Sequence, residues 1–200
     1  TNTLVTGGIP ATPTTSIFNL SIDADTGFIV GGAVGMSLNQ FMQGLRVEAE
    51  VGYRQQNVNG VWNSTVVTTG GTTSVTGTLD YDHSSLSVMA NIWYDFNVGG
   101  VTPYIGGGIG WAETEVEGNF IDLTTPGVVP FSFDDNGFAW QVGAGVNFDI
   151  APNMKLGVGY RYFEGPEVTV LAPAVVTVNP LAGEVDDQNH SVLVNLTVGL

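Results

Sequence analysis

The chain has no cysteine, and only four of its 200 residues are lysine or arginine. The absence of cysteine excludes disulfides, thiolate catalysis and zinc sites built on cysteine. With 19 acidic residues the formal net charge is −15, which excludes nucleic-acid binding through neutralisation of phosphates. We therefore expect no nucleic-acid partner.

Long hydrophobic runs are missing as well. No stretch of the sequence approaches the roughly 18 consecutive apolar residues of a membrane-spanning helix. Charged residues make up 12% of the chain and hydrophobic residues 43%, and that charged share is about half the usual value for a soluble domain. Such a chain is either a soluble all-β protein or a membrane β-barrel. No signal peptide begins at Thr1, so we interpret the chain as a mature or a trimmed form.

What the chain does contain is a repeated alternation of apolar and polar residues, which predicts β-strands. In Leu45–Arg54 the apolar residues occupy one face and the charges the other, because successive side chains of a strand point to opposite faces. Seven segments of about ten residues show the pattern, and a tilted strand of that length crosses a bilayer. They are Thr26–Leu38, Leu45–Arg54, Ser85–Asn97, Val101–Ala112, Phe138–Ile150, Met154–Phe163 and Ser191–Leu200.

The connectors between these segments alternate between short and long. Long connectors of roughly 25–30 residues are unusual in a compact soluble domain. Short periplasmic turns on one rim and long extracellular loops on the other are typical of an outer-membrane barrel. The short connectors are Asn39–Gly44, Val98–Gly100 and Ala151–Asn153, and the long ones join Arg54 to Ser85, Ala112 to Phe138 and Phe163 to Ser191.

Aromatic residues fall on the apolar face near both ends of the expected strands, which predicts two girdles at the membrane surfaces. The alternative is a soluble β-sandwich with ordinary core aromatics. That alternative leaves Arg46, Glu48, Glu50 and Arg161 on the opposite face without a role. The predicted girdle residues are Phe28, Tyr53, Tyr94, Phe96, Trp111, Phe138, Trp140, Phe148, Tyr160 and Tyr162.

All four cations share the polar strand face with four acidic residues. In a lipid-facing barrel this face lines the lumen, where buried charges must be paired and hydrogen-bonded. We therefore predict an ion-pair network that fills the lumen and is formally neutral, so that the net −15 belongs to the long-loop end. The alternative is a gate that rearranges to pass small ions. The network residues are Arg46, Glu48, Glu50, Arg54, Asp95, Asp149, Lys155 and Arg161.

Acidic clusters in the loops provide a candidate for weak calcium binding, because hard cations prefer carboxylate and amide oxygens. None of the clusters has EF-hand spacing, and a solvated acidic surface is the alternative. We expect no other cofactor. The candidate calcium ligands are Asp23, Asp25, Asp134, Asp135, Asp186 and Asp187.

Catalysis has few candidate residues. His190, Ser191 and Asp187 superficially offer the residue types of barrel enzymes that edit lipopolysaccharide. However, Ser191 is expected to point inward, its neighbour His190 to point outward, and no nucleophile motif surrounds the serine. We therefore predict no catalytic residues, with a lipid A-modifying enzyme as the remaining enzymatic alternative.

At this point a family resemblance emerges. The stretches VTPYIGGGIG (101–110) and WQVGAGVNFDIAPNMKLGVGYRYF (140–163) are similar to hairpins of the OmpA-like or Opa-type small outer-membrane β-barrels. The match covers about residues 26–200. It implies an all-β, antiparallel, up-and-down transmembrane barrel, most often of eight strands, in the bacterial outer membrane. Outer-membrane lipid and lipopolysaccharide are then the expected surroundings.

The chain departs from this family at both ends. Residues 1–25 are rich in Thr and Pro, and we expect them to be an extracellular loop or a partial first strand ahead of a single barrel domain at 26–200. An eighth strand would come from residues 1–22 or lie outside this sequence. The last residue is Leu200 where the family usually has an aromatic residue.

The resemblance implies a function without enzymatic activity. We expect a surface barrel that acts as an adhesin, a surface antigen or an envelope scaffold, with acidic loops exposed to the outside. An extracellular or envelope protein is the expected kind of partner. A narrow ion channel gated by the lumen ion pairs is the alternative.

Overall fold

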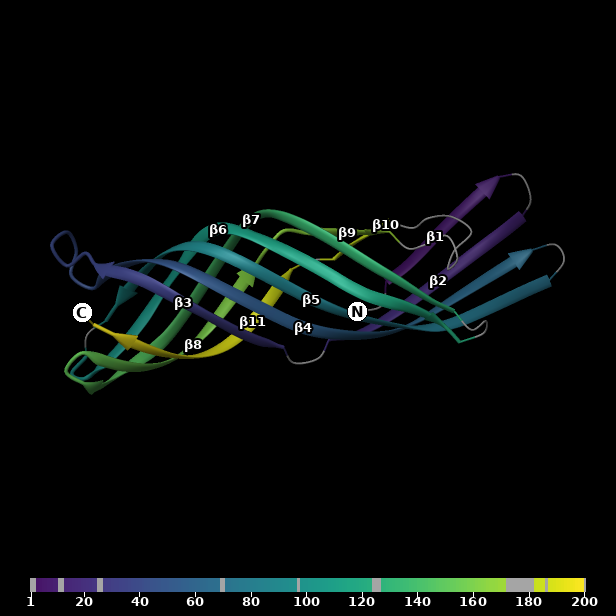
Figure 1. Ribbon diagram of the computed structural model, residues 1–200. Helices are drawn as coiled ribbons and strands as arrows, with labels where there is room; N and C mark the ends of the chain where they lie inside the picture. The colour runs from purple at the N-terminus through teal and green to yellow at the C-terminus, as the bar shows by residue number, and fades with distance from the viewer. Residues whose placement is uncertain are drawn as a thin grey trace.

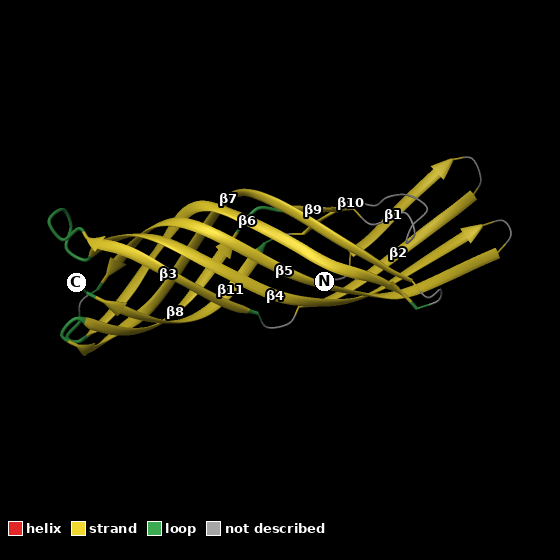
Figure 2. Cartoon of the chain, in the orientation of Figure 1, coloured by secondary structure: helices red, strands yellow, loops and turns green. Residues whose placement is uncertain are grey.

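The computed structural model describes residues 3–10, 13–24, 27–68, 71–96, 98–123, 127–171, 182–185 and 187–199. Regular structure in these residues consists of eleven β-strands joined by turns (Figure 2). None of the described residues belongs to a helix that could cross a membrane. The strands are β1 (Thr3–Pro10), β2 (Pro13–Ala24), β3 (Phe28–Ser37), β4 (Leu45–Thr68), β5 (Gly71–Asp95), β6 (Val101–Asp122), β7 (Gly127–Ala151), β8 (Met154–Glu164), β9 (Val168–Leu171), β10 (Ala182–Val185) and β11 (Gln188–Val198).

Nine of these strands form one antiparallel sheet. Its order is β1-β2-β4-β5-β6-β7-β8-β11, and β3 also pairs with β4, while β9 and β10 form a separate small hairpin. Neighbours in the sheet are neighbours in the chain from β3 to β8, which is the up-and-down order expected of an outer-membrane barrel. The sheet curls around a long axis, with the tight turns at one end and the hairpin tips at the other (Figure 1).

The strands predicted from alternation are present, and seven of the described strands occupy the curled half: β3 to β8 and β11. The sheet does not close there, because β3 and β11 have no strand on their outer edges among the described residues. The described residues before β3, 3–10 and 13–24, do not fill this gap. Instead β2 pairs with the far part of β4, and its last pair, Ala24 with Val58, lies just beyond the first pair of β3, Phe28 with Gln55.

The long connectors expected after β4 and β6 are regular hairpins in the structure. Strands β4 to β7 are each between 22 and 25 residues long, so they run far beyond the ten residues that a bilayer requires. We call the part of β4 to β7 beyond Arg54, Ser85, Thr114 and Asp135 the extension. Its inner face is apolar: Trp62 and Leu79 are buried, and Tyr81, Val129 and Phe131 pack against them. This second core explains why the chain stays extended and paired here.

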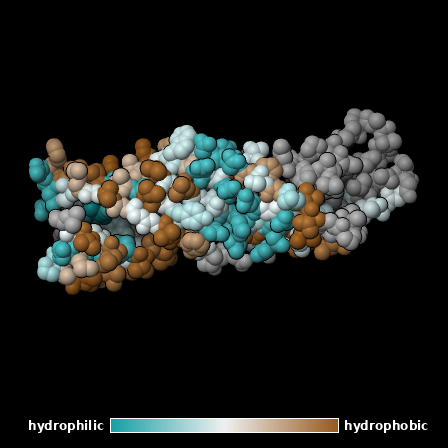
Figure 3. Space-filling view, viewed as in Figure 1, coloured by the Kyte–Doolittle hydropathy of each residue, from teal (hydrophilic) through white to brown (hydrophobic). Residues whose placement is uncertain are grey.

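The outer surface of the curled half is apolar. Large aliphatic side chains point outward and are exposed on every strand there, for example Val34 on β3 and Val192 on β11, which are 77% and 75% exposed. Figure 3 shows hydrophobic residues gathered over this half and hydrophilic residues over the middle of the molecule, where the extension begins. A surface of this kind is stable against lipid, whereas in water it would be an aggregation site.

Candidate functional site: the charged lumen and its mouth

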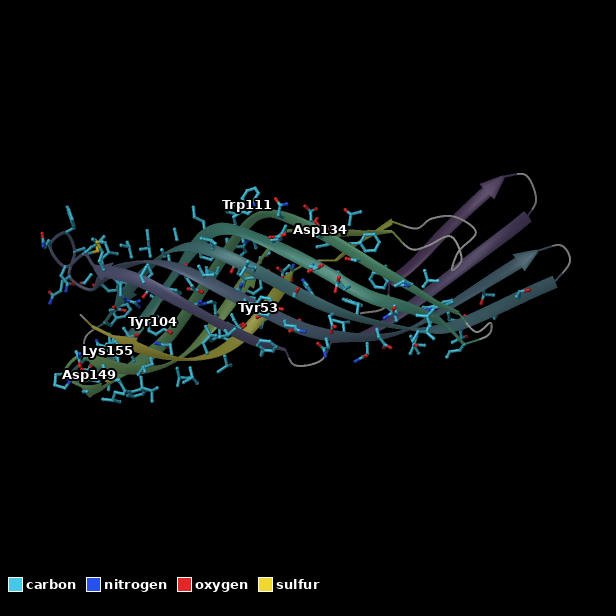
Figure 4. All side chains as sticks on the ribbon, viewed as in Figure 1. Tyr53, Tyr104, Trp111, Asp134, Asp149 and Lys155 are labelled. Carbon is cyan, nitrogen blue, oxygen red and sulfur yellow. The ribbon has the colours of Figure 1, made fainter. Side chains whose placement is uncertain are left out.

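The charges nearest the tight turns form two groups on the inward strand faces. Arg46 on β4 donates to both carboxylate oxygens of Asp95 on β5, from Nε at 3.0 Å and from Nη2 at 3.3 Å, and it also pairs with Glu48. On the opposite wall Lys155 lies 3.5 Å from Asp149, its cross-strand neighbour (Figure 4). The structure therefore pairs all five charged residues, in one group of three on β4 and β5 and one pair on β7 and β8.

Glu50 is the centre of the lumen network. Its Oε1 accepts from Nη1 of Arg161 at 2.5 Å, and its Oε2 accepts from Asn91 at 2.8 Å and from Gln141 at 3.4 Å. These partners come from β5, β7 and β8, so the carboxylate of a β4 residue links opposite walls of the sheet. Trp93 and the three partners fill the middle of the lumen, since Trp93, Asn91 and Gln141 are almost completely buried.

Arg54 lies where the charged lumen meets the extension, a level that we call the lumen mouth. Its side chain is buried, and the residue is only 4% exposed. Its Nη1 donates to Ser87 at 2.8 Å, and its guanidinium carbon lies 3.6 Å from the ring centre of Phe163. No carboxylate of the described residues is within 4 Å, and neither Nε nor Nη2 has a hydrogen-bond partner among them. The lumen has as many cations as acids, as the sequence indicates, but they do not pair one to one. Among the described residues Arg46 forms ion pairs with two acids and Arg54 with none.

Asp187 also lies at the lumen mouth, and it reaches there from the segment before β11. It precedes β11, yet its Oδ2 accepts from the hydroxyl of Thr114 on β6 at 2.9 Å, and its Oδ1 lies 3.6 Å from Nε2 of His83 on β5. The backbone oxygen of Asp187 also accepts from the N–H of Gly165 at 2.9 Å. Burial lowers the pKa of His83, and the charge of Asp187 partly opposes this shift. The sequence predicts Asp187 on the acidic surface, and nothing in the alternation indicates that it reaches Thr114 on β6.

The ten predicted girdle residues lie on the outward face in two groups. Seven of them are exposed and three, Tyr53, Trp140 and Tyr162, are half-buried. Rings in the loop-side group contact one another, as Trp140 and Tyr162 do with centres 5.3 Å apart. In Figure 4 Trp111 points away from the barrel, and Asp134 lies farther toward the hairpin tips. The loop-side aromatic residues thus mark the level at which apolar outer residues give way to acidic ones.

The outer face of the extension carries carboxylates on adjacent strands. Glu115 and Glu117 lie on β6, with Glu113 just before the start of the extension, and Asp134 on β7 faces Glu115. Repulsion from Glu117 raises the pKa of Glu115, with further contributions from Asp134 and Glu113. Farther out, a cavity of about 640 Å³ is lined by carboxylate and amide side chains together with two aromatic rings; its lining includes Asn57, Asp80, Asp82, Glu117, Tyr81 and Phe131.

The candidate calcium and catalytic residues do not form compact sites in the described part of the chain. No three metal-ligating side chains converge there; Asp134 and Asp135 are exposed, whereas Asp187 is buried at the mouth. The side chains of Asp23, Asp25 and Asp186 lie outside the described residues, and calcium binding stays a prediction.

The residues with catalytic potential have separate partners. Nδ1 of His190 lies 2.5 Å from the hydroxyl of Tyr160 on the outer surface, and Ser191 donates to Asn189. Asp187 contacts Thr114 and approaches His83, as described above. The structure therefore does not bring Ser191, His190 and Asp187 together as a nucleophile, base and acid.

Comparison with known proteins matches almost the whole chain to one family, and up to about two thirds of it to individual relatives. Residues 5–198 match the family described as outer membrane protein beta-barrel domain. An uncharacterised protein of Brucella abortus (strain 2308) is 34% identical over 143 residues, which is 66% of this chain and 49% of that protein. The outer membrane protein PagN of Salmonella typhimurium is 31% identical over 83 residues, 41% of this chain and 35% of that protein. The match thus spans about half the length of the Brucella relative.

The chain also aligns with a solved structure. The crystal structure of Neisserial surface protein A aligns with 92% of this chain and 97% of its own, at 17% sequence identity and a TM-score of 0.39. An outer membrane protein of Gluconacetobacter diazotrophicus is 30% identical over 145 residues, 68% of this chain and 35% of that protein.

Proposed function

Because the chain belongs to the outer membrane protein beta-barrel family and is a barrel protein of the bacterial outer membrane, we propose that it is a non-enzymatic surface protein. It acts as an adhesin, surface antigen or envelope scaffold that presents an acidic sheet to the outside. We call the curled half without the extension the membrane half: β3, β8, β11 and the parts of β4 to β7 on the turn side of Arg54, Ser85, Thr114 and Asp135. It anchors the acidic sheet in lipid and lipopolysaccharide through its aromatic girdles.

One observation carries the proposal: the extension is an ordered, outward-facing acidic surface. Its outer face bears Asp80, Asp82, Glu115, Glu117 and Asp134, and Glu113 lies just before it on β6. All four cations of the chain lie on inward faces of the membrane half, so none of them neutralises this surface. Complementary charge steers partners and sets specificity. A basic patch on another protein therefore fits this face.

The lumen supports a structural role for the ion pairs. Side chains fill the interior of a barrel of about eight strands, and here Glu50, Asn91, Gln141 and Trp93 meet across the middle. A gated ion channel is the competing function. It requires that the hydrogen bonds of Glu50 break while the barrel stays folded.

The surface function is tested with cells that display the protein. The triple variant Glu113→Gln, Glu115→Gln, Glu117→Gln removes three outward charges without changing side-chain shape. We expect binding to polylysine-coated beads to fall severalfold in low salt, and the difference to shrink at higher ionic strength because exposed charges are screened. Equal binding by the wild-type protein and the triple variant would contradict the proposal.

A matched control removes charge from the lumen instead. Glu48→Gln and Asp95→Asn lie on the inward face, so the pair should leave bead binding unchanged in protein that reaches the surface folded. The channel alternative has its own readout. Steady ion conductance of the wild-type protein in planar bilayers, changed by Glu50→Ala, would favour the gate over the plug.

A further inference from the structure

The outer face of the extension has one apolar level on an otherwise mostly polar surface. Val61 and Val128, on the first and last of the four strands, are 52% and 61% exposed there. Figure 3 shows hydrophobic residues on the tip side of the hydrophilic middle of the molecule. Adjacent exposed apolar side chains beside polar ones, on a surface that faces water, mark an interaction site. We call this level the apolar row; paired across β4 to β7, it consists of Val61, Thr78, Ile121 and Val128.

The cavity of about 640 Å³ lies next to the apolar row, on the side of the membrane half. Three consecutive residues from each strand line it: 57–59, 80–82, 117–119 and 130–132. The first and third residue of every triplet are exposed, whereas the middle one is buried or half-buried. The cavity is therefore a hollow on the outer face, between two rows of outward side chains. Its volume is in the range of ordinary ligand sites.

The hollow is rich in hydrogen-bond acceptors and negatively charged. Asp82 and Glu117 face each other on β5 and β6, and Asp80 follows two residues farther along β5. All four lysine and arginine residues of the chain lie on inward faces of the membrane half, so none of them neutralises these carboxylates. The hollow thus attracts a positively charged group and repels an anion. The remaining outward lining residues are Asn57, Asn59, Asn119, Pro130 and Ser132.

The hollow and the apolar row run side by side across the same four strands. The row through Asp80 and the apolar row are two residues apart on each strand, which is about 7 Å. Four strands at about 4.8 Å spacing make each row about 14 Å long, the length of about four residues of an extended chain. Successive side chains of such a chain point to opposite sides. A chain lying between the rows would thus direct one set of side chains to the carboxylates and the other to the valines.

We propose that the hollow and the apolar row form one docking surface for an extended segment of a partner protein in which basic and apolar residues alternate. The basic side chains bind Asp80, Asp82 and Glu117, and the apolar ones cover Val61 and Val128. This inference rests on the surface function proposed above and narrows its partner, because positive charge alone satisfies only the hollow.

The experiment measures binding of labelled peptides by fluorescence anisotropy to the whole chain in nanodiscs of zwitterionic phosphatidylcholine, with empty nanodiscs as the blank. One peptide alternates lysine and valine, a second has serine in place of valine, and a third has glutamine in place of lysine. We expect the lysine–valine peptide to bind about threefold to tenfold more tightly than the lysine–serine peptide, because covering the valines adds a hydrophobic contribution. The glutamine–valine peptide should bind at least as weakly as the lysine–serine peptide.

Two double variants separate the halves of the docking surface. Asp82→Asn with Glu117→Gln removes charge from the hollow and should weaken both lysine peptides about threefold to tenfold, the range of two exposed ion pairs. Val61→Thr with Val128→Thr keeps the branched shape and removes the apolar surface. It should weaken the lysine–valine peptide alone. All four side chains are exposed, so the variants should fold like the wild-type protein.

The matched control for charge is Glu113→Gln with Asp134→Asn. It removes two exposed carboxylates from the same outer surface, and neither of them lines the hollow. Binding of the lysine–valine peptide should stay within about twofold of the wild-type value, since exposed charges more than about 10 Å away are largely screened at ordinary ionic strength.

The outcomes distinguish this inference from the surface function on which it rests. Equal affinity for the two lysine peptides, with equal losses in the hollow variant and the charge control, would overturn the docking surface and leave a general acidic surface in place. If neither lysine peptide bound above the blank, both would be wrong. Equal binding of the glutamine–valine and lysine–valine peptides would show that charge has no part in recognition, and would also overturn the inference.

Discussion

Strands β4 to β7 pass through two regions of the molecule, and the inward face changes character between them. In the membrane half the inward residues of β4 include Arg46, Glu48 and Glu50, and the outward residues are apolar. In the extension the inward residues of β4 include Val58 and Trp62, both buried, and most of the residues that face outward on the same four strands are polar or acidic. The alternation keeps its phase from one region to the other, and only its polarity is reversed.

The difference shows that the solvent on the outside decides which residues a sheet places on each face. Next to lipid the outer face is apolar and the inner face holds paired charges, whereas next to water the inner face is the hydrophobic core. The reversal occurs between Arg54, the last inward cation of β4, and Val58, the first buried aliphatic residue. A charge should therefore be tolerated on the inner face of the membrane half and on the outer face of the extension, and an apolar residue on the other two faces.

The largest expected effect comes from breaking the charged interior of the membrane half. Glu50→Ala leaves Arg161 buried without its carboxylate, and loss of one partner of a buried pair costs about 3–5 kcal/mol. Urea unfolding in lipid vesicles measures the loss. The double variant Glu50→Leu with Arg161→Met removes both charges and should recover most of it. A loss of equal size in the double variant would mean that packing at position 50, and not the unpaired charge, determines stability.

A charge placed on the outer face compares the two regions directly. Ile109 on β6 is 60% exposed between the girdles and Val61 on β4 is 52% exposed in the extension. Ile109→Arg should destabilise the protein by about 2–4 kcal/mol, because an arginine near the bilayer centre faces lipid. Val61→Arg faces water and should change stability by less than about 0.5 kcal/mol. Equal costs in urea unfolding from vesicles would place the two positions in the same environment.

Much of the membrane half could be predicted from the sequence, because the bilayer imposes a simple period. The alternation in Leu45–Arg54 locates a strand and assigns its faces, and the expected antiparallel barrel fold and outer-membrane location are confirmed. The number of strands in the described sheet was harder to predict. Residues 16–22 alternate, but the pattern alone does not show that they pair with β4 beyond the membrane half and not between β3 and β11.

The extension and the lumen mouth were missed for two different reasons. The extension has a local signal, since Val58, Trp62 and Leu79 continue the inward phase of β4 and β5. That signal is hidden as long as each strand face is expected to keep one polarity along its whole length. The mouth has no local signal. Thr114 and Asp187 are 73 residues apart and meet only because the sheet curls. Their contact, like the Arg54 donors that have no partner among the described residues, could be recognised only in the structure.

His83 lies at the boundary between the two regions and should make stability depend on pH. Burial lowers its pKa from the usual value of about 6.5. Between the lowered value and about 6.5 the unfolded chain binds a proton at His83 that the folded chain does not. Stability from the neutral imidazole is therefore fully present above about pH 6.5 and is lost as the pH falls below it. Unfolding of His83→Asn should lack this step, whereas His190→Asn should keep it.

The smallest expected effect concerns the crowded carboxylates on the outer face of the extension. Glu115 is fully exposed, and its raised pKa results first from Glu117 and then from Asp134 and Glu113. Since the charged form is disfavoured in the folded state, Glu115→Gln should raise Tm slightly at pH 7. At about 1 M salt the screening length falls to about 3 Å, and the gain should disappear. An increase in Tm that persists in high salt would have to arise from the glutamine side chain itself, and would mean that repulsion does not limit stability at this surface. Asp149→Asn in the membrane half is the opposite case, because Asp149 lies 3.5 Å from Lys155, and the loss of this carboxylate should lower Tm.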